Sequence, residues 1–229
     1  MKKFLPVALC AAALFAAALP GHAADVSRAT LIERLDTCEA ILQDIQSSTK
    51  TAISPERLRA ARAIVIVNQV QAGFFVGVKD GYAVALVKRP NGRWSVPAFL
   101  NAGEASIGFQ AGARAINTVL VVMDDNTVQL LLKRRFNIGL EAHAEAGIRT
   151  AEAQAVTRPL PAANVYVYGL QEGLYLSAAI KTGYMSPNDE ANRVFYNSNN
   201  RLPELLFSDW VQPPPETHYI MDYLTRLSQ

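Results

Sequence analysis

Residues 64–87 read IVIVNQVQAGFFVGVKDGYAVALV, and this stretch decides the fold class. It opens with four consecutive β-branched residues, which is the composition of a buried strand. Asp80-Gly81 stands between two further apolar stretches, 74–78 and 82–87, an arrangement that strongly indicates a two-residue hairpin turn. A few residues later, Pro90-Asn91-Gly92 supplies another turn. The stretch therefore predicts sequential antiparallel strands.

Outward from this stretch the strand signal continues, and helical signals flank it. Further strands are predicted over 94–100, 105–111, 119–123, 136–146, 164–169 and 174–180. Helices are predicted over 26–47, from Ser54-Pro55, over 127–135, from Ser186-Pro187-Asn188-Asp189, and on both sides of Pro213-Pro214-Pro215. Sequential strands with helices at the ends predict an α+β domain on a mostly antiparallel sheet, with barrel-like closure as one option.

The helix predicted over Val26–Ser47 carries an apolar stripe at spacings of three and four residues. The stripe consists of Leu31, Leu35, Cys38, Leu42 and Ile45. The opposite face carries four acidic residues, Glu33, Asp36, Glu39 and Asp44, which an anionic membrane would repel. We therefore expect this helix to dock on its own domain, with Cys38 in the core.

The N-terminus has the order of a secretory signal. Two lysines precede an apolar run over 4–19, and Gly21-His22-Ala23 places small residues three and one before a cleavage point. This order predicts a signal peptide over residues 1–23, cleaved near Ala23. The remaining residues, 24–229, are expected to form one domain in the periplasm or cell envelope.

Charge is distributed unevenly along the chain. Residues 25–49 and 94–229 each have a net charge of −3, whereas residues 50–93 carry eight basic and two acidic residues. This segment predicts a basic surface that meets an anionic partner, although nucleic acid does not suit an exported protein of modest charge. The candidate residues are Arg57, Arg59, Arg62, Lys79, Lys88, Arg89 and Arg93, with Trp94 as a ring suited to a membrane interface.

Ordinary catalytic motifs are absent from the sequence. It contains no Gly-x-Ser-x-Gly elbow, no phosphate loop and no cysteine pair for zinc. Glu141, His143 and Glu145 alternate, so a strand would place them on one face, where they could hold a divalent metal. Because no fourth ligand can be named, we expect the polar face of a strand, with no metal, no cofactor and no enzymatic activity.

Several short blocks, taken in order, resemble the SYLF lipid-binding domain family. They are Ala72-Gly73-Phe74, Trp94-Ser95 with Pro97-Ala98-Phe99, the glycines at 103, 108 and 112, and Tyr168 with Gly173-Leu174-Tyr175. The resemblance spans residues 54–196 and implies a non-enzymatic domain. Eukaryotic relatives bind phosphoinositides and some fungal ones bind actin. For an exported bacterial-type member it implies affinity for anionic phospholipid headgroups.

The leading hypothesis is therefore a lipid-binding module that meets a periplasmic membrane face through the basic residues of 57–93. Changing Lys88, Arg89 and Arg93 together to Gln is expected to weaken binding without loss of stability, since exposed charges contribute little to folding. The alternative is an envelope scaffold that binds a protein partner and no lipid. Exposed apolar surface at the Pro-rich tail would favour that alternative.

Overall fold

A computed structural model of the chain describes residues 26–73, 76–107, 112–137, 144–146, 163–169 and 184–229. The predicted signal peptide, the strand predicted over 174–180, Glu141 and His143 lie outside this part.

The described chain contains seven strands, six α-helices and one short 3-10 helix. The strands are β1 Ala63–Gly73, β2 Val76–Val87, β3 Ala98–Ile107, β4 Gly112–Val122, β5 Ala144–Ala146, β6 Val165–Gly169 and β7 Tyr184–Pro187. The helices are α2 Arg28–Ser47, α3 Pro55–Ala60, α4 Asp125–Leu130, α8 Asp189–Tyr196, α9 Leu202–Phe207, η1 Pro215–Thr217 and α10 His218–Leu227.

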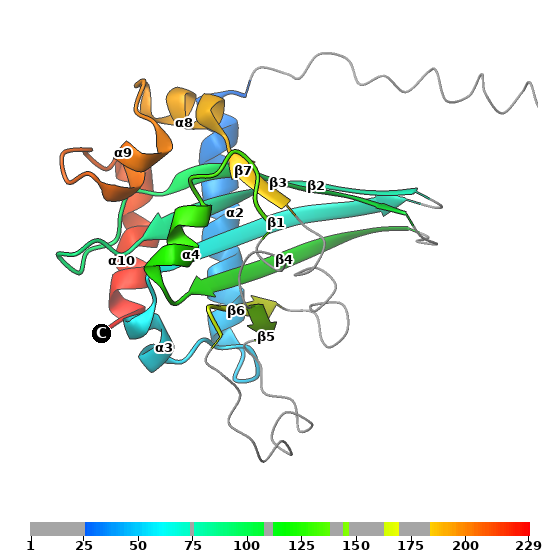
Figure 1. Cartoon of the computed structure of the whole chain (residues 1–229), viewed down its shortest axis with the longest axis horizontal. Helices are drawn as coiled ribbons and strands as arrows, with labels where there is room; N and C mark the ends of the chain where they lie inside the picture. Colours follow the sequence, from blue (N-terminus) through cyan, green and yellow to red (C-terminus); the bar gives the residue numbers. More distant parts are fainter. Residues whose placement is uncertain (1–25, 74–75, 108–111, 138–143, 147–162, 170–183) are drawn as a thin grey trace, which may run out of the picture.

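All seven strands form one sheet in the order β5-β6-β4-β1-β2-β3-β7. Every neighbouring pair is antiparallel except β5 with β6, so the α+β prediction with a mostly antiparallel sheet is confirmed. Barrel-like closure is not found, because β5 and β7 remain separate edges in the part of the chain that the structure describes. Figure 1 shows α3, α9 and α10 at one end of the sheet, while β1 to β4 extend past the helices at the other end.

The hairpin turn predicted at Asp80-Gly81 is wrong. β2 runs straight through both residues, and Gly81 pairs with Gln69 in the middle of the ladder. Glycine is needed here because the backbone of β1 comes very close to β2: a Cβ at Gly81 would lie 2.1 Å from the backbone oxygen of Asn68. The segments 74–78 and 82–87 therefore do not pair with each other; β2 pairs with β1 in an antiparallel ladder that ends at Gly73 opposite Gly77.

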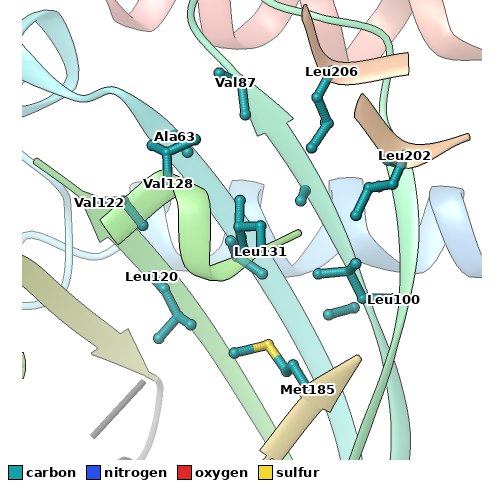
Figure 2. Close-up of a cluster of buried hydrophobic side chains, with 14 of the residues drawn as sticks. Ala63, Val87, Leu100, Leu120, Val122, Val128, Leu131, Met185, Leu202 and Leu206 are labelled. Atoms are coloured by element: carbon teal, nitrogen blue, oxygen red, sulfur yellow. The ribbon is translucent and has the colours of Figure 1, made fainter. Parts of the chain in front are cut away.

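Alternating residues of the central strands bury both faces of the sheet. Ile64 and Ile66 of β1 face α2, α8 and α10, whereas Val65 and Val67 face α4 and α9. Figure 2 shows the second cluster, in which the labelled side chains are Ala63, Val87, Leu100, Leu120, Val122, Val128, Leu131, Met185, Leu202 and Leu206. This double burial explains the continuous apolar run at 64–67, which lacks the polar alternation of a half-exposed strand.

The first predicted helix is confirmed as α2, and it docks on the domain as expected. Ser27 caps it by accepting a hydrogen bond from the backbone N–H of Thr30. Leu31, Leu35, Cys38 and Leu42 are fully buried in the cluster on this side of the sheet. Burial also raises the pKa of the Cys38 thiol far above its ordinary value.

Other predicted boundaries shift by a few residues for local reasons. The helix predicted to end at Arg135 ends at Leu130, because backbone bonds three residues apart then replace the α-helical pattern. α8 is capped by Asn188, whose side chain accepts from the N–H of Ala191, and Ser186 belongs to β7 instead. The strand predicted from Trp94 begins only at position 98.

A row of polar residues crosses the sheet where the double-sided core ends. Asn117, Asn68, Tyr82, Asn101 and Ser186 stand opposite one another on five neighbouring strands. Side-chain hydrogen bonds join the first two residues at 3.3 Å and the last two at 3.4 Å. Most of the apolar core therefore lies between this row and the end of the sheet where β1 begins and β2 ends, with Ala102, Ile116 and Met185 buried just beyond the row.

Candidate functional site

The topology gathers most of the predicted basic residues at one end of the sheet. α3 and the link to β1 carry three of them, and the segment after β2 carries the other three. Ala63 pairs with Val87, so the start of β1 and the end of β2 lie side by side. In Figure 1 this end lies at the left, beside α3, α9 and α10. We call it the basic end and define it by Arg57, Arg59, Arg62, Lys88, Arg89 and Arg93.

Lys88 is tied to the last turn of α3. Its Nζ donates to the backbone oxygens of Leu58 and Arg59, both at 2.9 Å, and lies 4.9 Å from the ring centroid of Trp94. The arrangement satisfies two carbonyls that the short helix would leave free. Burial, and then the nearby charge of Arg62, lower the pKa of Lys88. The two cations therefore lie close enough to repel each other.

Arg89 is buried, and its side chain links the β2–β3 connection to α9. Its side chain donates to the backbone oxygens of Leu206 at 3.4 Å and Leu205 at 3.2 Å, and pairs with Asp209 at 3.4 Å. Only 5% of the residue is exposed. Burial lowers the pKa of Arg89, Asp209 opposes this, and Arg93 lowers it further. The expectation that Arg89 is an exposed cation, replaceable without loss of stability, is therefore wrong.

Arg57 is held by two tyrosines of β6. Its guanidinium carbon lies 3.8 Å from the ring centroid of Tyr166, and Nη1 donates to the hydroxyl of Tyr168. Tyr168 is buried, and burial raises the pKa of its hydroxyl while the bond from Arg57 works against that change. Ser54 caps α3 by accepting from the N–H of Arg57, as the sequence predicted.

Three guanidinium groups of the basic end remain at the surface. Arg59 is exposed and donates to the backbone oxygen of Gln229 at 3.1 Å. Arg62 pairs with Asp125 at 3.0 Å, and 46% of its side chain stays exposed. Arg93 is exposed at the predicted turn, where Gly92 adopts a φ of 79° and donates to the oxygen of Arg89 at 2.9 Å. These three groups are the ones that an anionic partner can meet.

The two remaining predicted site residues do not form part of the exposed surface of the basic end. Trp94 is 3% exposed and belongs to the core cluster beneath α2, so its ring packs inside the domain and does not reach a membrane interface. Lys79 stands in β2 opposite Gln71 and Glu104, toward the other end of the strand. The structure does not describe the side chain of Lys79.

The sequence reasoning missed four side chains at this end. Asp125 and Asp209 are the acidic partners of Arg62 and Arg89. Phe207 and Trp210 are among the few large apolar side chains that the described structure exposes, at 37% and 59%. A tryptophan in a short segment between Asp209 and a Pro-rich stretch was the available signal, since such a segment has little core to bury it.

The structure also bears on the acidic face of α2, on the metal hypothesis and on membrane spanning. Glu33, Asp36 and Asp44 are exposed on the outer face of α2, so the acidic face predicted there is present. Of the alternating Glu-His-Glu set, only Glu145 falls in the described chain, in β5. Among the described residues no group of three His, Cys, Asp or Glu side chains could hold a metal ion. No described helix is long and apolar enough to cross a membrane.

Comparison with known proteins gives a consistent result. The family model named Ysc84, with the description Las17-binding protein actin regulator, matches residues 103–227. The match therefore includes α9 and α10, beyond the region of the SYLF resemblance. No solved structure matches the chain.

Curated relatives resemble the chain at low identity over most of its length. SH3 domain-containing YSC84-like protein 1 from Xenopus laevis is 26% identical over 180 residues, 76% of this chain and 53% of the relative. The Homo sapiens protein of that name is 25% identical over 171 residues, 72% of this chain and 49% of the relative. LAS seventeen-binding protein 3 from Saccharomyces cerevisiae is 26% identical over 166 residues, which cover 71% of this chain and 36% of the relative. The chain thus spans about half or less of the length of these relatives.

Proposed function

The chain belongs to the Ysc84 family, and from that premise we propose that it is an exported, non-enzymatic module that binds anionic phospholipid headgroups at a periplasmic membrane face. The membership agrees with the SYLF resemblance, which implied lipid binding. One observation carries the proposal: the exposed guanidinium groups of Arg59, Arg62 and Arg93 share one end of the molecule. Guanidinium groups suit phosphate oxygens because their N–H donors match phosphate geometry.

The charge distribution predicts how the domain is oriented on the bilayer and how tightly it binds. The acidic outer face of α2 would be repelled by an anionic bilayer, so the basic end is the side that approaches it. A basic residue near an anionic surface contributes about 1 kcal/mol, and salt screens that contribution. Three such groups give weak, reversible attachment. Arg89 and Lys88 serve this surface indirectly, by fixing the segments that present it.

The test is co-sedimentation of the chain from the envelope fraction with vesicles of phosphatidylglycerol or cardiolipin, and with neutral phosphatidylcholine vesicles. N-terminal sequencing of the same material checks export, with Ala24 expected as the first residue. Binding is expected on the anionic vesicles only, and it should fade as salt rises. Equal binding to neutral vesicles, or no response to salt, would contradict the electrostatic mechanism.

A matched pair of variants makes the test specific to the basic end. Arg59→Gln with Arg62→Gln removes two of its exposed charges and should weaken anionic binding about thirtyfold, since each contributes about 1 kcal/mol and about 1.4 kcal/mol corresponds to a factor of ten. Arg134→Gln with Arg193→Gln removes the same charge from exposed positions beyond α4 and on α8. If both pairs weaken binding equally, net charge and not this end of the molecule drives attachment.

A second candidate function is binding of a protein partner with no lipid ligand. Exposed apolar surface at the Pro-rich tail was expected to favour this function, and Phe207, Trp210 and Tyr219 are exposed there. The family description, Las17-binding protein, names a protein partner for relatives. This candidate predicts that the chain sediments with no vesicle of either composition.

A further inference from the structure

Two aromatic side chains stand in solvent at the segment between α9 and η1. Trp210 is 59% exposed and Phe207 is 37% exposed. They belong to a group of only four large apolar side chains that the described structure leaves exposed, the others being Val70 and Tyr219. A single exposed apolar side chain is common, but two large rings three residues apart in one short segment make a candidate contact surface.

The segment that carries these rings is firmly fixed. The carboxylate of Asp209, next to Trp210, accepts hydrogen bonds from Arg89 at 3.4 Å and from Asn91 at 3.1 Å. Leu206 is fully buried on one side of the pair, and Val211 is 6% exposed on the other. The backbone is thus anchored on both sides of Trp210, so binding does not have to order the segment that presents the ring.

The same contacts place the rings beside the basic end. Asn91 and Arg89 belong to the connection between β2 and β3, which also carries the exposed Arg93. In Figure 1 this connection and the segment after α9 both lie at the left end of the molecule. Asp209 is engaged by Arg89, so Arg93 supplies the positive charge next to the rings.

We propose that Trp210 and Phe207 form an interfacial anchor that enters the headgroup region of an anionic bilayer, with Arg93 on the adjacent phosphates. The inference rests on the proposed lipid function and adds an apolar component to it. A protein partner would also cover exposed rings, but the neighbouring cations favour an anionic lipid surface. Tryptophan has a further preference for the headgroup level, because its ring is apolar and its N–H is polar.

Tyr219 offers a matched control for the anchor. It is 50% exposed, close to the value for Trp210, but it lies on α10. Its hydroxyl accepts from Gln43 of α2 at 3.0 Å, and its ring stacks on Tyr223 with centroids 6.2 Å apart. It therefore lies against the helix whose outer face is acidic, which an anionic bilayer would avoid.

Intrinsic fluorescence tests the anchor directly, because the chain contains two tryptophans and Trp94 is 3% exposed. Titration with phosphatidylglycerol vesicles should shift emission to the blue, and brominated acyl chains should quench it. Trp210→Phe should abolish both signals yet keep most of the binding. Trp210→Ala should weaken vesicle binding roughly five- to tenfold, since interfacial affinity scales with buried apolar area. Tyr219→Ala should bind like the parent chain.

The outcomes separate the anchor from the proposed function. If the parent chain binds anionic vesicles while its emission is unchanged and Trp210→Ala binds equally well, the anchor is wrong and electrostatic attachment stands. If the parent chain binds no vesicles, both are overturned and protein contact remains for this surface. Equal melting temperatures of parent and Trp210→Ala would exclude misfolding as the cause of a loss.

Discussion

Arg89 and Glu39 are charged side chains on opposite sides of the sheet, and their hydrogen-bonding environments differ. On the α9 side, Arg89 finds two backbone oxygens and Asp209. On the α2 side, Glu39 is half-buried, and its Oε1 is buried without a hydrogen-bond partner among the described residues. Burial, and then the charge of Asp36, raise the pKa of Glu39 to about 7, although a hydrogen bond from the N–H of Ile220 opposes the change.

The difference shows what makes a buried charge tolerable. A buried guanidinium that donates to backbone oxygens and pairs with a carboxylate can keep its charge, whereas a half-buried carboxyl with one unpaired oxygen binds its proton more tightly than usual. Arg89 therefore fixes α9 and the segment of Trp210 at any ordinary pH. Glu39 faces the start of α10, and its raised pKa predicts that the stability of the packing between α2 and α10 varies with pH.

The largest effect is expected when a charge enters the α2 interface with no partner at all. Leu35 is fully buried in the cluster on this side. Leu35→Asp should lower the free energy of unfolding by about 4 kcal/mol, because it removes apolar contacts and buries an unpaired carboxylate. Chemical denaturation measures the change.

Leu35→Met is the control, with an expected loss below about 1.5 kcal/mol since volume is conserved. A Leu35→Asp variant that melts like the parent but no longer binds vesicles would show that this helix faces lipid, contrary to its burial here.

A smaller loss is expected from Arg89→Gln. The change leaves the oxygens of Leu205 and Leu206 without their donor and should destabilise the domain by about 2–3 kcal/mol. Arg93→Gln, four residues along, should stay within about 0.5 kcal/mol of the parent because Arg93 is exposed. Thermal unfolding of the pair measures both. Equal stability of the two variants would contradict the structural role of the buried Arg89 side chain.

The smallest effect is expected from Glu39→Gln, and it changes with pH. The folded chain holds the Glu39 proton more tightly than the unfolded chain, so this stabilisation is present below about pH 4.5 and is lost as the pH rises through about 7. Gln mimics the protonated acid. The variant should match the parent at acidic pH and exceed it by about 1 kcal/mol at pH 8, allowing for partial exposure.

Unfolding followed at several pH values checks this prediction. A parent chain whose stability rises across that range relative to Glu39→Gln would show that the carboxylate is stabilised in its ionised form.

Sequence patterns predicted the elements whose signals are local. The apolar stripe of α2 and the β-branched run at 64–67 each require a buried face, so helix, strand and core residues followed. The turn at Gly92 was also predictable, since its positive φ favours glycine. Gly81 gave the same local signal for a different reason: β1 approaches too closely there for any Cβ.

The sequence by itself determined that a basic segment follows the first helix and that this segment contains apolar strands. Only the tertiary structure decided which of those cations reach solvent. Lys88 and Arg89 follow β2 directly, and the helix ends that meet them, α3 and α9, come from opposite parts of the chain. A charge run cannot reveal such partners, because the carbonyls that neutralise a side chain are set by packing and not by sequence neighbours.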